Sequence, residues 1–489
     1  MMRKLKILMV ASEVLPYAKT GGLADVVRSL SSVLAERGHQ ATIVLPYYRE
    51  VQKRFPEIEP VGVNVRIDMS GRMEIAKALR HRVSHNLTAY FVANDKYYDR
   101  DELYGDASGD YEDNAERFIF FDRAVVAICE AMNYRPDIVH CHDWHTGLVT
   151  LYIKENRLQK DGFWNGSALV FTIHNIGYQG VFGGDSLHLT DLDSSYFNPQ
   201  GIEFFGKINL MKAGILYADR INTVSKRFAE EIQTEELGYG LDGVLRERRK
   251  ALTGILNGVD YSEWSPETDR YIKRNYTKQD LSGKRECKRE LIEIFRLEAD
   301  LNTPLIGFVS RMTRQKGIDI LIEAIPQIVK MHAGLVVLGK GEETYVEKIE
   351  EMGRTFRGKI GVKIAFDNAL AHKIEAGCDI FLMPSMYEPC GLNQMYSLRY
   401  GTVPVVRATG GLDDTVREFS TRTLEGNGFR FRPYTARSML HALKKTIGFY
   451  RDALMWRRIM KNGMKEDFSW DSSAKRYERL YAAALKGVR

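Results

Sequence analysis

The sequence is poor in cysteine and proline for its length. It has five cysteines in 489 residues, an odd number, and none of them forms a C-x-x-C pair or stands with histidines at zinc-ligand spacing. We therefore expect reduced thiols in a cytoplasmic protein. With 13 prolines, 44% hydrophobic and 27% charged residues, the composition excludes collagen, long disordered segments and coiled-coil arrays.

The sequence also lacks a long apolar run. No uncharged apolar stretch approaches the roughly 18 residues that span a bilayer. The N-terminal MMRKLKILMVASEVLP resembles a secretion signal, but Ser12 and Glu13 end its apolar run after five residues. This segment predicts a first buried strand, and we expect neither membrane insertion nor secretion.

Net charge is small, with 70 basic against 64 acidic residues, but residues 430–489 hold 15 lysines and arginines against five acidic residues. Such a basic tail is compatible with nucleic acid, phosphate or a membrane surface. Its charges interleave with Trp456, Tyr477 and Tyr481 at helical spacing, which favours a solvated helix face. We therefore predict no nucleic-acid partner and no membrane partner.

The length predicts two or three domains, at about 150 residues each. Short β-branched and aliphatic runs alternate with helical periodicity, which is typical of βαβ units around parallel sheets. The first series of expected strands covers 6–11, 41–46, 87–94, 137–143, 168–175, 220–225 and 251–258. The second series covers 304–310, 335–340, 362–366, 379–385 and 403–408.

The predicted fold class is therefore α/β, with two Rossmann-like doubly wound parallel-sheet domains that face a central cleft. The polar stretch 261–300 separates the two series, so we expect domains at 1–258 and 259–464. Residues 465–489 are expected to form a helix that packs back on the first domain. Ligands of doubly wound sheets bind beyond the carboxyl ends of the strands, so the chemistry is expected in strand-to-helix loops.

Some motif matches lack the context that they need. Gly238–Gly243 satisfies G-x-G-x-x-G but follows a charged helical run instead of a strand, and Gly334–Lys340 resembles a P-loop without its Ser/Thr. Two D-x-D pairs, at Asp99 and at Asp191, are expected by chance among 64 acidic residues. We predict no metal site.

Two glycine turns begin expected helices. Lys19 and the pair Gly21-Gly22 follow the first strand, where backbone N–H groups, the helix dipole and a cation together suit an anion. A glycine turn with a solvated lysine is the alternative. A second TGGL turn, with Gly410-Gly411, follows the strand expected at 403–408.

Polar side chains follow other strands. Arg311 and Lys316 follow the first strand of the second domain, where two cations can stabilise a departing diphosphate, and Glu388 can accept hydrogen bonds from sugar hydroxyls. His142–His145 and His174 end neighbouring strands of the first domain. Paired histidines suggest zinc, but no third ligand stands at metal spacing, and hydrogen bonding with stacking of a sugar on Trp144 is favoured.

The ordered motifs KTGGLADV, HDWH, FTIHN, GYGLDG, NGVD, SRMTRQKG, EPCGLNQ and TGGLDDTV resemble those of bacterial glycogen synthases and plant starch synthases, over nearly the whole chain. The resemblance implies the GT-B architecture. It also implies transfer of glucose from ADP-glucose, or less often UDP-glucose, to the non-reducing end of an α-1,4-glucan (glycogen or starch) with retention of configuration. No cofactor and no metal are implied.

The resemblance also implies roles for single residues. Asp143 is expected near the reacting centre, His174 near the donor glucose, Arg311 and Lys316 at the diphosphate, and Glu388 at glucose hydroxyls. Trp144 and Tyr178 are expected on the acceptor side. The implied nucleotide-sugar residues are Lys19, Gly21, Gly22, Asp25, Asn257, Phe366, Cys390, Gly391, Thr409, Gly410 and Gly411.

Two positions depart from related transferases. Tyr396 stands where many of them carry a second glutamate, and Phe366 lacks the hydroxyl of the tyrosine expected to stack on the base. No carboxylate pair presents itself as nucleophile and acid, so we expect a front-face route in which the leaving diphosphate takes the acceptor's proton. A phosphorylase-like or sucrose-type transferase, a Rossmann oxidoreductase and a non-catalytic glucan-binding protein are the alternatives.

Overall fold

A computed structural model of the chain describes residues 3–106 and 108–488. The chain divides into two compact units. The first comprises Met1–Val224, Ala229–Gly258 and Trp470–Arg489, and the second comprises Ser225–Phe228 and Val259–Ser469. The C-terminal segment thus rejoins the first unit at Trp470.

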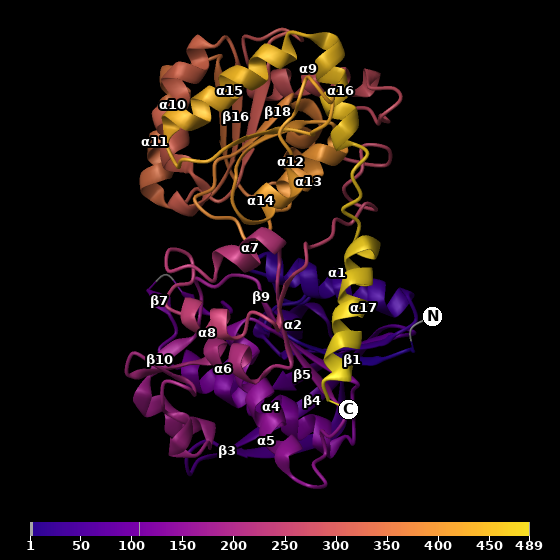
Figure 1. Cartoon of the computed structure of the whole chain (residues 1–489), viewed down its shortest axis with the longest axis vertical. Helices are drawn as coiled ribbons and strands as arrows, with labels where there is room; N and C mark the ends of the chain where they lie inside the picture. The colour runs from indigo at the N-terminus through magenta and orange to yellow at the C-terminus, as the bar shows by residue number, and fades with distance from the viewer. Residues whose placement is uncertain (1–2, 107, 489) are drawn as a thin grey trace. The chain divides into compact units, whose positions relative to one another are not determined.

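The first unit is built on a mostly parallel sheet (Figure 1). Among the described residues its strands lie in the order β14 (Leu252–Gly254), β13 (Arg220–Thr223), β9 (Ala168–Ile173), β8 (Ile138–His142), β1 (Lys6–Val10), β2 (Gln40–Pro46), β5 (Leu87–Ala93), β4 (Met73–Ser84) and β3 (Glu59–Asp68). Only β3 and β4 are antiparallel to their neighbours. This edge hairpin was not among the expected strands, because half-exposed strands alternate polar and apolar residues and lack the continuous apolar runs of a parallel sheet.

Helices and two small sheets complete the first unit. The helices are α1 (Gly22–Glu36), α2 (Arg49–Arg54), α3 (Asp95–Tyr98), α4 (Asn114–Ala131), η1 (Trp144–Thr146), α5 (Gly147–Leu158), η2 (Gly184–Thr190), η3 (Ser194–Tyr196), α6 (Leu210–Tyr217), α8 (Asp242–Glu247) and α17 (Trp470–Lys486), while α7 (Lys226–Glu231) begins in the second unit. The small sheets hold β10 (Val181–Gly183), β11 (Glu203–Phe204), β12 (Lys207–Asn209), β6 (Gly105–Asp106) and β7 (Gly109–Asp110).

Helix α17, drawn in yellow among the indigo and purple elements of the first unit (Figure 1), packs on α1, β9 and β13. Its Tyr477 and Tyr481 are fully buried. Glu478 accepts hydrogen bonds from Nε and Nη2 of Arg37 at 2.9 and 2.8 Å. The aromatic side of this part of the basic tail is therefore core.

The second unit has a parallel sheet in the order β17 (Ile360–Ile364), β16 (Gly334–Gly339), β15 (Leu305–Val309), β18 (Ile380–Met383), β19 (Val403–Arg407) and β20 (Phe429–Phe431). Its helices are α9 (Ser282–Phe295), η4 (Arg314–Lys316), α10 (Ile318–Lys330), α11 (Glu343–Thr355), α12 (Asn368–Gly377), α13 (Asn393–Tyr400), α14 (Gly410–Thr415), α15 (Ala436–Tyr450) and α16 (Ala453–Gly463). Leu335 and Val337 of β16 belong to one hydrophobic cluster, and Val336 and Leu338 to another. The sheet is thus buried on both faces, as a doubly wound fold requires.

Each sheet has one point at which its strand order reverses. In the first unit β1 and β8 flank this point, and in the second unit β15 and β18 do. The loops that leave neighbouring strands there run in opposite directions and open a crevice, which is where ligands of such sheets bind. Within the described ranges no helix is long and apolar enough to cross a membrane.

Candidate active site

Glu13 organises the loop that follows β1. This buried carboxylate accepts hydrogen bonds from the backbone N–H of Thr20 at 2.5 Å, from its hydroxyl at 2.7 Å and from the N–H of Gly21 at 3.0 Å. Glu13 therefore fixes the conformation of the glycine turn that precedes α1. In the sequence, Glu13 marked only the end of an apolar run; a carboxylate within three residues of a buried strand was the signal for its role.

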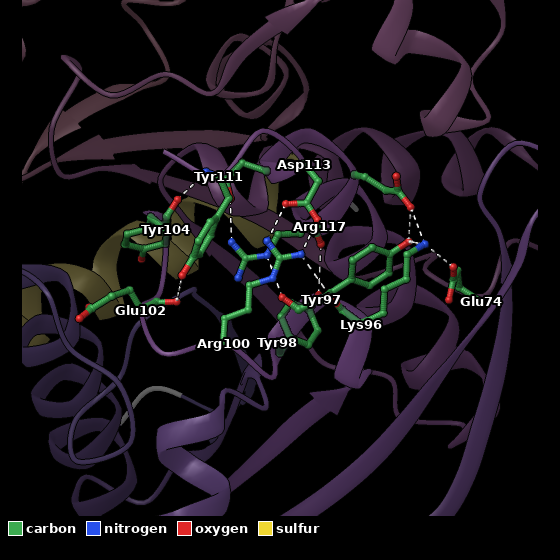
Figure 2. A network of polar contacts seen from close by, with 12 residues as sticks. Glu74, Lys96, Tyr97, Tyr98, Arg100, Glu102, Tyr104, Tyr111, Asp113 and Arg117 are labelled. Atoms are coloured by element: carbon green, nitrogen blue, oxygen red, sulfur yellow. Dashed lines mark hydrogen bonds and ion pairs between the residues drawn. The ribbon is translucent and has the colours of Figure 1, made fainter. Parts of the chain in front are cut away.

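Tyr104 supports Glu13 from a second segment. Its hydroxyl donates to Glu13 Oε1 at 2.8 Å, and burial, followed by the charge of Glu13, raises its pKa well above its ordinary value. The Tyr104 carbonyl accepts from the Tyr111 N–H, and the buried Arg117 guanidinium donates to the Tyr97 carbonyl (Figure 2). Arg117 also donates to the carbonyl of Leu103. A polar network around Tyr104 thus positions Glu13, and Glu13 in turn positions the glycine turn.

The first glycine pair faces open space. A Cβ built on Gly21 or Gly22 meets no atom within 4 Å. The Gly21 N–H, which we expected to approach a phosphate, donates to Glu13 instead. This leaves the start of α1 and Lys19, whose Nζ lies 2.8 Å from Asp25 Oδ2, as the anion-binding features of the loop.

Asp143 directly follows β8 and has an unusual backbone conformation. Its φ of 58° is positive, which is rare for a residue with a side chain and marks strain held by the surrounding structure. Its Oδ1 accepts from the backbone N–H of His174 at 2.7 Å. Burial raises the pKa of Asp143 to about 7, against hydrogen bonds from the His174 and Asn175 backbones that lower it.

A buried and a partly buried histidine connect the ends of β8 and β9. His142 Nδ1 lies 3.0 Å from His174 Nε2, and burial lowers the pKa of His142 well below its ordinary value and that of His174 to about 3. Both rings are neutral. His142 Nε2 is buried and has no hydrogen-bond partner among the described residues. Because an orphan acceptor costs less than an orphan N–H, we assign the shared proton to His142 Nδ1, which leaves the proton of His174 on Nδ1.

Trp144 is a packing residue. Its ring is 9% exposed, stacks on His145 at a centroid distance of 3.9 Å and contacts Phe118 and Phe182 edge-on. A Cβ on Gly180 would fall 2.3 Å from the same ring. The structure corrects the expectation of a sugar platform, because the ring is enclosed by its neighbours.

Two further predicted residues of the first unit differ in exposure. Tyr178 is 58% exposed in the loop after β9. Asn257 is buried, and its Oδ1 has no hydrogen-bond partner within the described part of the chain. Tyr178 is therefore accessible to a ligand, whereas Asn257 holds a buried acceptor.

In the second unit, Lys316 and Glu388 meet at the reversal point of the sheet. Lys316 Nζ donates to Glu388 Oε2 at 2.6 Å and to Oε1 at 2.9 Å, and the hydroxyl of buried Ser385 donates to Oε2 at 3.0 Å. These side chains line a cavity of about 110 Å³ between the ends of β15 and β18. Gly391, which is in the predicted set, also lines it.

Other predicted residues of this unit lie on the surface. Arg311 is exposed and forms no ion pair with a described residue. Strand β17 ends at Ile364, two residues earlier than expected, so Phe366 lies in the following loop and is 86% exposed. Both side chains are thus accessible to a ligand.

The second glycine pair is a packing feature. A Cβ on Gly410 would fall 2.0 Å from the Glu388 carbonyl oxygen, and one on Gly411 would fall 1.9 Å from that of Cys390. The Gly411 N–H donates to the carbonyls of Glu388 and Pro389, both at 3.1 Å. We expected this amide to bind a glucose hydroxyl, but it is already engaged in holding the loop against α14.

Thr409, another residue of the predicted nucleotide-sugar set, directly precedes α14 and is buried, with 2% of its surface exposed.

Tyr396, where a related transferase carries glutamate, stacks on Trp264 with ring centroids 3.9 Å apart. Trp264 also stacks on His372, at 3.7 Å. The position is thus built into an aromatic stack. In the described part of the chain, no group of three His, Cys, Asp or Glu side chains is arranged to hold a metal ion.

Comparison with known proteins decides the family. The starch synthase catalytic domain family matches residues 6–247, and glycosyl transferases group 1 matches residues 290–455. A glycogen synthase of Geotalea uraniireducens is 46% identical over 98% of this chain and 99% of its own length. The chain belongs to the glycogen synthase and starch synthase family. It is a glycosyltransferase that acts as a glycogen (starch) synthase.

Other relatives agree. A glycogen synthase of Koribacter versatilis is 45% identical over 97% of both chains. The catalytic domain of starch synthase IV from Arabidopsis thaliana, bound to ADP and acarbose, superimposes with a TM-score of 0.88 at 31% identity, over 99% of this chain and 100% of that one. Its GT-B fold confirms the predicted fold class. A sucrose-phosphate synthase from Thermosynechococcus elongatus, with a TM-score of 0.61 at 18% identity over 98% of both chains, shares the fold alone.

Proposed function

We propose that this synthase transfers glucose from ADP-glucose to the non-reducing end of an α-1,4-glucan, with retention of configuration and without a metal. The observation that carries the proposal is the pairing of Lys316 with Glu388 in the cavity at the reversal point of the second sheet. A cation and a sugar-binding carboxylate are side by side where a nucleotide sugar binds in such folds. The related starch synthase bound to ADP and acarbose supports an adenine nucleotide and a glucan-like acceptor.

Two cations of the second unit supply the charge for the diphosphate. Arg311 has its guanidinium fork exposed, and this group binds phosphate oxygens with two parallel hydrogen bonds. Lys316 donates to Glu388 in the free protein and has three N–H bonds, so it can serve a phosphate while it stays paired. Together they stabilise negative charge on the leaving group without a metal ion.

In the proposed step, the bond between glucose C1 and the β-phosphate oxygen breaks as the acceptor's 4-hydroxyl forms a new bond to C1 on the same face. The acceptor proton passes to the departing phosphate oxygen. The electron pair of the broken bond stays on the diphosphate, which Arg311 and Lys316 hold. The oxocarbenium-like centre forms only in the transition state, so charge stabilisation there raises turnover.

The first unit contributes polar groups suited to glucose. Because His174 Nε2 is bonded to His142, the N–H group at His174 Nδ1 remains available, and it can donate a hydrogen bond to a sugar hydroxyl. Asp143, with a pKa of about 7, exists in both forms near neutral pH and either accepts or donates a hydrogen bond. Since Asp143 is buried and held by backbone N–H groups, we assign it positioning and electrostatic work in place of nucleophilic attack.

The proposal is tested by incubating the purified chain with maltoheptaose and either ADP-glucose or UDP-glucose, without added metal and with EDTA. We expect ADP release with ADP-glucose to exceed UDP release at equal concentration, with lengthening of the glucan. Proton NMR of the first product should show an α-linkage. Preference for UDP-glucose, a β-linked product or complete loss of transfer in EDTA contradicts the corresponding part of the proposal.

A further inference from the structure

A second, larger cavity lies beside the free edge of the second unit's sheet. It has a volume of about 830 Å³ and is lined by the end of α9, by α11, by the edge strand β17 and by the start of α12. This volume is in the range of small-molecule sites. None of its lining residues lines the cavity around Glu388. The groove is therefore a separate feature of the fold.

The lining of this groove is basic. Arg296, Arg354, Arg357, Lys363 and Lys373 line it, against the acidic residues Glu350 and Asp367. The Lys373 ammonium pairs with Glu290 at 2.6 Å, and Asp367 accepts from the Leu370 N–H at the start of α12. The other four cations form no ion pair with a described residue. Gathering them at one edge costs electrostatic energy that a bound anion would relieve.

The local packing brings these cations together. A Cβ on Gly361 of β17 would fall 2.3 Å from the Phe295 ring, and one on Gly353 of α11 would fall 3.0 Å from Val362. The two glycines let α9 and α11 approach the edge strand from opposite faces. Arg296 ends α9 at a φ of 51°, in the left-handed region where glycine is preferred. Arg296 thus places a long basic side chain at a position where the backbone conformation favours glycine.

We propose that this groove binds a small molecule carrying one or more phosphate groups, at a site separate from that of the sugar nucleotide. Three guanidinium groups match phosphate oxygens in geometry and charge, and Lys363 adds a point charge on the strand between the two helices. The groove takes its residues from the outer edge of the sheet, whereas the donor residues Lys316 and Glu388 stand at its reversal point. This inference does not depend on the identity of the sugar donor.

Tripolyphosphate is the probe, titrated calorimetrically into the full chain at low salt. The background carries Arg311→Ala and Lys316→Ala, which removes the diphosphate-binding cations of the donor site. We expect saturable binding of one tripolyphosphate per chain in this background. Adding Arg354→Glu with Arg357→Glu should weaken binding by at least tenfold. The matched control adds Lys330→Glu with Lys348→Glu, on exposed positions of α10 and α11 that do not line the groove, and should change affinity by less than twofold.

Two outcomes overturn the inference: no saturable binding in the background, or equal weakening by both charge reversals, which shows that net charge alone attracts the anion. Thermal melting checks that each variant is folded. If the double reversal does not fold, Arg357→Gln replaces it, with an expected weakening of at least threefold and Lys348→Gln as its control. In the otherwise wild-type chain, Arg354→Glu with Arg357→Glu should leave glucosyl transfer without tripolyphosphate unchanged, because neither residue belongs to the catalytic site.

Discussion

The Nζ atom of Lys316 lies 2.6 and 2.9 Å from the two carboxylate oxygens of Glu388. The two residues are 72 positions apart and reach the same cavity from the ends of β15 and β18. Their side chains are 19% and 7% exposed, so each charge is kept largely out of water by the presence of the other. The pair therefore prepares a cation and a sugar-binding carboxylate before substrate arrives.

Replacing Lys316 by alanine should lower turnover about 100-fold, since removal of one charge that stabilises the transition state costs about 3 kcal/mol. Steady-state kinetics with ADP-glucose and maltoheptaose measures this loss. Lys330→Ala, on the exposed face of α10, is the control and should keep wild-type turnover. A folded Lys316→Ala protein with full turnover contradicts the assigned role.

Replacing Glu13 by alanine should lower kcat/KM for ADP-glucose by about 10- to 100-fold, because three hydrogen bonds that shape the glycine turn are lost. Tyr104→Phe removes only one hydrogen bond to the same carboxylate. Because the bonds from Glu13 to the glycine turn remain, this variant should lose less kcat/KM than Glu13→Ala. Equal losses in the two variants would show that the turn does not depend on Glu13 itself.

The two glycine pairs should respond to alanine in opposite ways. Gly21→Ala meets open space at a φ of −141°, so unfolding free energy should change by less than about 0.5 kcal/mol. Gly411→Ala places a Cβ 1.9 Å from a carbonyl oxygen and should destabilise the protein by about 2 kcal/mol or more. Denaturant titration of both variants measures this contrast. Equal destabilisation would mean that the first turn is as tightly packed as the second.

Asp143 should make stability depend on pH. Its folded pKa of about 7 lies above its unfolded value, so its stabilising contribution is complete below about pH 4 and is lost as pH rises through 7. Asp143→Asn cannot ionise. Relative to wild type, the variant should therefore gain about 2 kcal/mol between pH 5 and pH 7, because the slope of about 1.4 kcal/mol per pH unit flattens as the pH reaches the folded pKa. Chemical denaturation at both pH values measures the difference, and a stability difference that is the same at both would contradict the raised pKa.

Buried His140 and partly buried His174 act in the other direction. Burial lowers the pKa of both to about 3, so their contribution to stability is present above pH 6.5 and falls as pH drops toward 3. The comparison of Asp143→Asn with wild type cancels this shared background, because both proteins keep the histidines. The pH dependence that differs between them then belongs to Asp143.

Phe366→Ala should raise KM for ADP-glucose about tenfold and leave stability unchanged, because the side chain is 86% exposed and a stacked base is worth about 1–3 kcal/mol. Kinetics at saturating maltoheptaose measures the effect. Leu454→Ala is the control, an apolar residue of the same unit that is 82% exposed. An unchanged KM in Phe366→Ala would remove this residue from the nucleotide site.

The regular elements followed well from sequence, because buried parallel strands are continuous apolar runs that end at polar loops. The run KILMVA predicted β1, and LVVLGK predicted β16, to within a residue or two. The β3–β4 hairpin was missed, since its alternating pattern carries a weaker signal. The site loops were found by the same logic, whereas Glu13, Tyr104 and Ser385 were not assigned a role, because their partners lie far away in the sequence or are backbone groups.

Sequence by itself determined the family, the two parallel-sheet units and the residue types in the strand-to-helix loops, because these depend on local periodicity and on ordered motifs. Tertiary structure decided what each loop residue contacts. It enclosed Trp144 within a packed cluster, and it set Gly410 and Gly411 against backbone carbonyls while Gly21 and Gly22 face open space. Two identical TGGL turns thus have different structural roles. A glycine is required where another atom lies too close for a Cβ, and the sequence of the turn does not specify which distant residue supplies that atom.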